Sequence, residues 1–170
     1  MTDVTDAGDR IARLRKLAGL MLGTGVRSIG PLREDGSGLD VILFRPPDAR
    51  PVPAFVDGEL RLHVLTHAWR LESSERVLAG GCDSAELLGP VLEDLVGRRI
   101  TGMDITRPGL DTTLVLGDVR LRLFPVSSVP LPEGYPAWTL RTAQGVVLVA
   151  GPGGNWGMAG RRRKKQEAAE

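Results

Sequence analysis

The chain has 170 residues, of which 42% are apolar and only 4% aromatic, so we expect one compact domain whose core is mainly leucine and valine. Its formal net charge is +1, but residues 161–170 hold five basic and two acidic side chains, which leaves residues 1–160 slightly negative. The slightly negative charge of residues 1–160 argues against nucleic-acid binding by this part of the chain. The single cysteine, Cys82, excludes an intrachain disulfide.

The first residues, MTDVTDAGD, are acidic, whereas a secretory signal begins with basic and then apolar residues. No apolar run approaches the roughly 20 residues that span a bilayer. We therefore expect a cytoplasmic protein that does not enter a membrane. The preference for arginine over lysine is typical of GC-rich bacterial genomes.

Residues 1–24 are predicted to form an N-terminal amphipathic helix. Ile11, Leu14, Leu17 and Met21 recur at the spacing of one helical face.

Residues 25–82 and 97–157 are predicted to form two related β units, each of about five short antiparallel strands. In VRLRL, residues 119–123, apolar and charged side chains alternate, and LRLHV, residues 60–64, follows the same period. A strand with this pattern has one buried and one solvent-facing side.

Short segments recur in the same order in both units, which predicts a tandem duplication. The matched segments are 38–40 with 109–111, 58–65 with 117–124, 68–71 with 137–140, and 76–81 with 146–154. We expect each unit to cover the apolar face of the other, with Trp69 and Trp138 in equivalent core positions.

Residues 83–96 are predicted to form a linking helix, in which Asp83 and Glu86 have the spacing of a capping box. Pro90 either breaks this segment or starts a second short helix. Residues 158–170 are predicted to be a disordered basic tail. The expected fold is α+β and mainly antiparallel β, with two quasi-equivalent five-stranded meander halves packed together.

Two unmatched insertions, at residues 45–56 and 125–136, interrupt the symmetry of the units. Recognition is often carried by loops that a rigid scaffold holds in place. Tyr135 and Trp156 are the aromatic residues that we expect at the surface, where such residues anchor interfaces, and His67 is a further predicted binding residue.

No metal, cofactor or catalytic residue is predicted. His63 and His67 are the only histidines, and a metal site would also need ligands such as Cys82 or Asp83. We expect His63 to be exposed, because it matches Arg122 of the second unit.

Three residues keep an enzymatic alternative open. Cys82 precedes a predicted helix and could act as a nucleophile, although its counterpart region, GPGGNWG, has no thiol. Asp40 and Asp111 follow Gly-Leu in both units and could form an acid–base pair, although aspartate at a strand start commonly satisfies turn groups.

The run LVGRRITGMDITRPGLDTTLVLGDVRLRLFP, followed by WTLRTAQGVVLVAGPGGNW, resembles a family of small bacterial proteins of uncharacterised function. Their tandem units have the pattern PGLD…LRLFP…AWxL…GPGxxW, and the resemblance covers residues 25–156. It implies an immunity-type role, in which the protein neutralises a toxin by binding it. GGCDS stands where the family pattern has Gly-Ser-x-Asp, and the proline-rich insertion at residues 45–56 is not part of that pattern.

The predicted function is a non-enzymatic protein-binding module of the immunity or adaptor type, with another protein as partner. The alternative is an enzyme or small-ligand-binding protein that uses a groove between the halves, through Asp40, Asp111, Cys82 and His67. A weaker alternative is nucleic-acid binding through the tail, RRRKK. Open sheet edges also allow a homodimer.

Overall fold

The computed structural model describes residues 4–48, 58–127, 135–151 and 153–159. Its first half contains a helix, a short 3-10 helix and five strands. Their bounds are α1 Val4–Ala18, η1 Gly19–Met21, β1 Gly25–Pro31, β2 Leu39–Phe44, β3 Leu60–Val64, β4 Trp69–Glu72 and β5 Val77–Gly80.

The second half begins with another helix and continues with six strands. Their bounds are α2 Ala85–Glu93, β6 Gly102–Thr106, β7 Asp111–Leu116, β8 Val119–Leu123, β9 Trp138–Thr142, β10 Val147–Ala150 and β11 Trp156–Ala159. The mainly antiparallel α+β class expected from the sequence is therefore present.

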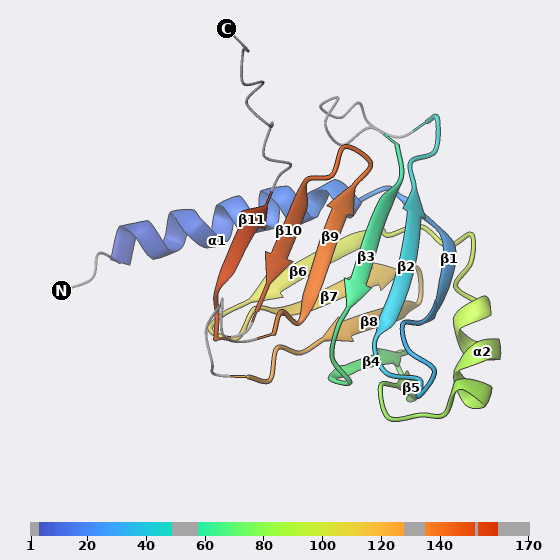
Figure 1. Cartoon of the computed structure of the whole chain (residues 1–170). Helices are drawn as coiled ribbons and strands as arrows, with labels where there is room; N and C mark the ends of the chain where they lie inside the picture. Colours follow the sequence, from blue (N-terminus) through green and yellow to red (C-terminus); the bar gives the residue numbers. More distant parts are fainter. Residues whose placement is uncertain (1–3, 49–57, 128–134, 152, 160–170) are drawn as a thin grey trace, which may run out of the picture.

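All the strands belong to two antiparallel sheets that face each other (Figure 1). The first sheet has the order β1-β2-β3-β9-β10-β11, and the second has the order β5-β4-β8-β7-β6. The first half gives three strands to the first sheet and two to the second, whereas the second half gives three strands to each sheet. The prediction that each half forms one five-stranded meander is wrong, because the chain crosses between the sheets after β3 and again after β8.

The two junctions between the halves have the same register. In the first sheet Val64 of β3 lies opposite Trp138 of β9, and in the second sheet Leu123 of β8 lies opposite Trp69 of β4. Both tryptophans are buried, with exposed fractions of 0% for Trp138 and 3% for Trp69. They occupy the related core positions expected from the sequence.

The start of β1 also pairs with the segment that precedes β6, through an isolated antiparallel bridge between Gly25 and Arg99. The bonds on its two sides match, since Val26 N donates to Arg98 O and Ile100 N donates to Thr24 O, each at 2.9 Å.

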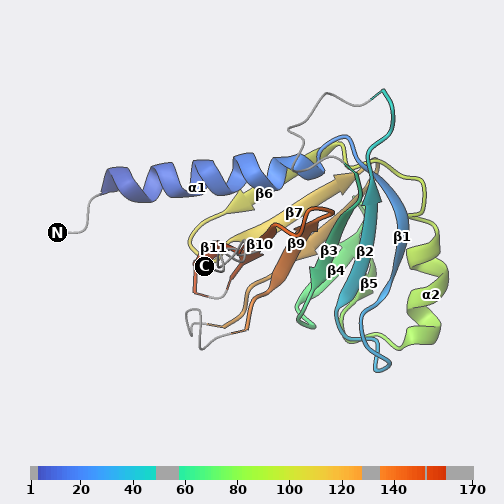
Figure 2. The same ribbon diagram turned by 45° about the horizontal axis from the view of Figure 1, so that its top comes forward.

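The helices close the two sides of the sandwich (Figure 2). α1 buries Leu14 completely, and its Arg15 donates through Nε and Nη2 to the carbonyl oxygen of Ile105 on the edge strand β6. α2 packs against β1 and β5 and buries Leu88 and Leu92. Neither helix of the described residues is long and apolar enough to cross a membrane.

The ends of these elements differ from the predictions in detail. α1 stops at Ala18, and residues 19–21 continue as a 3-10 turn. α2 is one helix that contains Pro90, and Ser84, not Asp83, occupies its N-cap position. β11 extends to Ala159, so residues 158 and 159 are strand rather than tail. The remainder of the predicted tail, residues 160–170, lies outside the described residues.

Alternating burial along the strands produces the core. β3 and β8 share one pattern, in which the first, third and fifth residues are buried, as the sequence predicts. The side chains between them are polar and face outward from each sheet. These outer faces and the loops between the sheets therefore carry the candidate functional residues.

Candidate functional site

A largely apolar hollow of about 710 Å³ lies where the chain crosses between the two sheets. We call it the crossover groove. It is lined by Arg33, Leu65, Thr66, His67, Ala68, Cys82, Val126 and Tyr135.

Backbone hydrogen bonds hold the crossing segments in place. Leu65 N donates to Ala137 O, and Phe124 N donates to Ala68 O, each at 2.8 Å. In each bond, the residue directly after one strand (β3 or β8) donates to the residue directly before its neighbour in the sheet (β9 or β4). The two bonds therefore join corresponding points of the two crossovers. The groove is therefore lined by loop residues, and two backbone hydrogen bonds tie these loops to each other next to the ends of β3 and β8.

Two side chains dominate the exposed wall of the groove. Tyr135 is 86% exposed and Val126 is 74% exposed, which makes them the two most exposed large apolar residues in the described part of the chain. Exposed apolar side chains gathered at a hollow mark a binding surface more often than isolated ones do. The predicted binding residue Tyr135 thus lies in the groove.

His67, the second predicted binding residue, lines the same groove as the exposed Cys82. The His67 Nδ1 atom is 2.9 Å from the carbonyl oxygen of Gly81. That carbonyl favours a proton on Nδ1, so that Nε2 of the neutral ring is an acceptor. An imidazole and a thiol in one groove are the residue types that nucleophilic catalysis uses.

Trp156, the third predicted binding residue, lies elsewhere. It lines a small depression of about 70 Å³ with Arg10, Ile11 and Leu110, where α1 meets the second half. It is half-buried and packs against the core. The structure therefore brings Tyr135 and His67 together and separates Trp156 from them.

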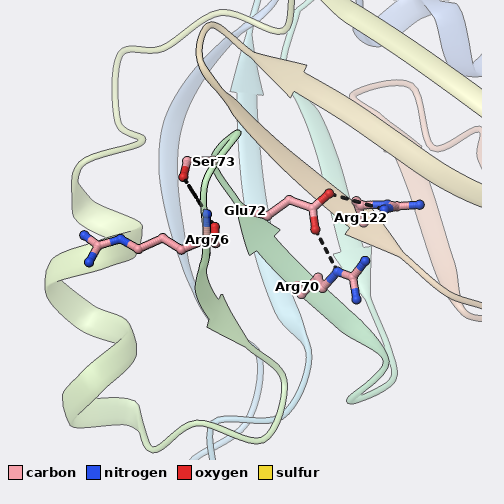
Figure 3. A network of polar contacts seen from close by, with 5 residues as sticks. All are labelled: Arg70, Glu72, Ser73, Arg76 and Arg122. Carbon is pink, nitrogen blue, oxygen red and sulfur yellow. Dashed lines mark hydrogen bonds and ion pairs between the residues drawn. The ribbon is translucent and has the colours of Figure 1, made fainter.

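A pair of arginines on the outer face of the second sheet adjoins the groove. Arg70 and Arg122 lie directly opposite each other on β4 and β8. Glu72 accepts from Arg70 Nε at 2.8 Å and from Arg122 Nη1 at 3.3 Å (Figure 3). Both guanidinium groups lie over the ring of Phe124. We call Arg70 and Arg122 the arginine pair.

Sequence reasoning missed the arginine pair. The alternation in GDVRLRLF and AWRL places these arginines on solvent-facing positions, but nothing in one sequence shows that β4 and β8 are neighbours. Pairing between the halves depends on the crossover, which the repeat alone does not predict.

Asp40 belongs to a different cluster, on the outer face of the first sheet. Both of its carboxylate oxygens accept hydrogen bonds from Arg61, and His63 Nε2 lies 3.2 Å from Oδ1. Hydrogen bonding from Arg61 lowers the pKa of Asp40 against the opposing effect of burial, and the charges of Arg61 and His63 add to that lowering. This carboxylate is therefore an ionised structural partner of Arg61.

Asp111 does not join Asp40. It starts β7 in the second sheet, opposite Thr106, whereas Asp40 lies opposite His63 in the first sheet. The position that corresponds to Asp40 by register is Thr113, opposite Arg122. Among the described residues, no group of three or more His, Cys, Asp or Glu side chains is placed to hold a metal ion.

Only part of the two predicted insertions, residues 45–56 and 125–136, lies within the described residues. Residues 49–57 of the first insertion and 128–134 of the second lie outside the described residues. Tyr135 and Val126 flank the second of these gaps.

Comparison with known proteins adds no assignment. No protein-family model matches the chain, and no curated protein or solved structure matches it significantly. The geometry of the crossover groove and of the outer sheet faces therefore carries the functional argument.

Proposed function

We propose that the chain is a non-enzymatic protein-binding module of the immunity or adaptor type, and that the crossover groove receives an apolar side chain of its protein partner. The observation that carries this proposal is that Val126 and Tyr135, the two most exposed large apolar residues in the described part of the chain, line one hollow. Aromatic side chains at such positions commonly anchor interfaces.

Charge indicates the chemistry of the partner. Among the described residues that line the groove, Arg33 is the one side chain with a permanent charge, and it is exposed. An apolar partner residue next to a carboxylate would bury its side chain against Leu65 and Ala68 and pair its charge with Arg33. An acidic protein segment therefore fits the groove better than a basic one.

Site-specific photo-crosslinking in the native host tests this function. A benzophenone amino acid at position 135 should yield one discrete adduct, and the crosslinked partner peptide should contain an acidic and an apolar residue. Val126→Ser should reduce the adduct strongly. A benzophenone at position 87 is the matched control, because Leu87 is 66% exposed on α2 and does not line the groove. Equal adducts from both positions would contradict the proposal.

His67 and Cys82 support a second candidate, a thiol-dependent acyl-transfer enzyme, because both line the same groove. In such a reaction the Cys82 sulfur attacks an acyl carbonyl, His67 Nε2 takes the thiol proton, and the leaving group departs. p-Nitrophenyl acetate should then release a burst of p-nitrophenol that Cys82→Ser abolishes and His67→Ala slows. Absence of the burst would remove this candidate.

We also infer that the two halves descend from one duplicated unit of a helix and five strands. The matching registers at both junctions support this origin, as does the Gly25–Arg99 bridge between corresponding segments. α1 and α2 also occupy corresponding places, since each precedes the first strand of its half and closes one side of the sandwich.

A further inference from the structure

The arginine pair places two like charges opposite each other, as Arg61 and Arg141 also do at the junction of β3 and β9 in the first sheet. Like charges directly opposite each other on neighbouring strands destabilise the pairing. The first sheet avoids that cost at the corresponding register position, where Thr139 lies opposite His63. The scaffold therefore does not require two arginines at this place.

Glu72 and Phe124 hold the pair in a fixed arrangement. Glu72 is only 16% exposed and binds both guanidinium groups, while the Phe124 ring lies 5.2 Å from Arg70 Cζ and 5.5 Å from Arg122 Cζ. In Figure 3 the two guanidinium groups project on the same side, whereas Arg76 points away toward α2. Fixed guanidinium groups lose little conformational entropy when they bind an anion.

The pair keeps donors free for a ligand. Among the described residues, Arg70 donates only through Nε and Arg122 only through Nη1, in both cases to Glu72. Their side chains are 42% and 37% exposed. One carboxylate between two arginines leaves a positive charge uncompensated, and exposed Arg120 on the same face of β8 adds another.

We propose that Arg70 and Arg122 form a carboxylate-binding site for an acidic segment of a protein partner whose apolar residue occupies the crossover groove. This inference rests on the proposed function and specifies the partner. The two sites are neighbours along the backbone, because Phe124 N donates to Ala68 O in the groove lining, and Val126 follows Phe124 by two residues.

The same face disfavours a nucleic acid. The Phe124 ring is already occupied by two guanidinium groups and is not available to stack a base. Asp104 and Asp111 lie on the outer side of β6 and β7 and would repel a phosphate backbone that continued across the sheet. One or two carboxylates of a short segment reach the pair without meeting them.

The test is an NMR titration of the full-length chain with the synthetic peptide acetyl-EDLFEDE-amide. The Nε–Hε signals of Arg70 and Arg122 should shift in a saturable way, together with the ring signals of Tyr135. The neutral peptide acetyl-QNLFQNQ-amide should leave the arginine signals unchanged.

Variants separate specific recognition from general charge. Arg122→Gln should weaken binding of the acidic peptide roughly tenfold, because one charge-assisted contact is lost. Arg141→Gln removes an exposed arginine from the outer face of the other sheet and should change the affinity less than about twofold. Arg122→Lys keeps the charge but not the planar fork and should give an intermediate loss.

The opposing outcomes are distinct. Unchanged arginine signals, or equal losses from the Arg122→Gln and Arg141→Gln variants, would overturn the carboxylate site. If Tyr135 alone shifts, this inference fails and the proposed groove stands; if the arginines alone shift, the groove proposal fails instead. If an oligothymidylate bound more tightly than the acidic peptide, the ligand would be a nucleic acid and the proposal would be wrong. If inorganic phosphate bound as tightly as the acidic peptide, the site would bind simple anions and would not recognise a protein segment.

Discussion

Trp138 donates its indole N–H to the hydroxyl oxygen of Thr112 at 3.1 Å, whereas the buried indole N–H of Trp69 has no partner among the described residues. Register explains the difference. Thr112 lies opposite Leu123, and the corresponding residue opposite Val64 is Leu39, which offers no acceptor. The two tryptophans therefore share a position in the fold but not a hydrogen bond.

We predict that Thr112→Val destabilises the protein by about 1–3 kcal/mol, because the valine keeps the volume and leaves a buried donor of Trp138 unsatisfied. Equilibrium unfolding in urea measures the loss. Thr113→Val is the matched control, since Thr113 faces outward opposite Arg122, and it should change the stability by less than about 0.5 kcal/mol. Equal losses in both variants would show that the hydrogen bond contributes little.

Gly81→Ala should be far more damaging than an ordinary glycine substitution. A Cβ at position 81 would lie 1.9 Å from the backbone oxygen of His67, so the crossover would have to move. We expect a loss of about 3 kcal/mol or more in the free energy of unfolding. In Gly30→Ala no described atom lies within 4 Å of the new Cβ, and the stability should hardly change. A mild Gly81→Ala variant would mean that the groove backbone adapts easily.

Neither half should fold alone, because each sheet takes strands from both halves. Fragments 1–84 and 85–170, expressed separately, should lack the dispersed amide NMR signals of a packed core. Mixing them should restore those signals in a one-to-one complex. A second pair of fragments, divided between residues 117 and 118 inside the β7–β8 turn, serves as the comparison, because this division separates the two strands of one hairpin. A monomeric, well-dispersed spectrum from fragment 1–84 would contradict the exchange of strands.

The sequence predicts the strands better than their partners. Alternation in residues 60–64 and 119–123 identifies both strands and their buried sides, because side-chain direction follows from local geometry. Which strands become neighbours depends on contacts across the chain, so the pairing of Val64 with Trp138 is not apparent from either segment. The groove residues are likewise predictable one by one but not as a group. Tyr135 and His67 could be chosen from the sequence as exposed polar aromatic residues, whereas the crossover alone places them on one groove with Cys82.

The dependence of the free energy of unfolding on acidic pH should reveal the ion pair between Asp40 and Arg61. Because Arg61 holds the pKa of Asp40 below its ordinary value of 3.8, folding favours the ionised carboxylate. Its stabilising contribution is fully present above the unfolded pKa and is lost as the pH falls through the folded pKa. The free energy of unfolding of the parent protein should therefore fall more steeply between about pH 4 and pH 2 than that of Asp40→Asn.

Urea unfolding at several pH values tests this slope. Arg61→Gln should flatten the acid limb as Asp40→Asn does, and the double variant should add little, because both changes remove the same interaction. Arg141→Gln is the control, since this exposed arginine lies on the same sheet opposite Arg61 and has no bond to Asp40 among the described contacts. If all three single variants keep the parent slope, acid unfolding is governed by other carboxylates, of which Asp118, whose pKa Arg98 lowers by hydrogen bonding, is the next to test.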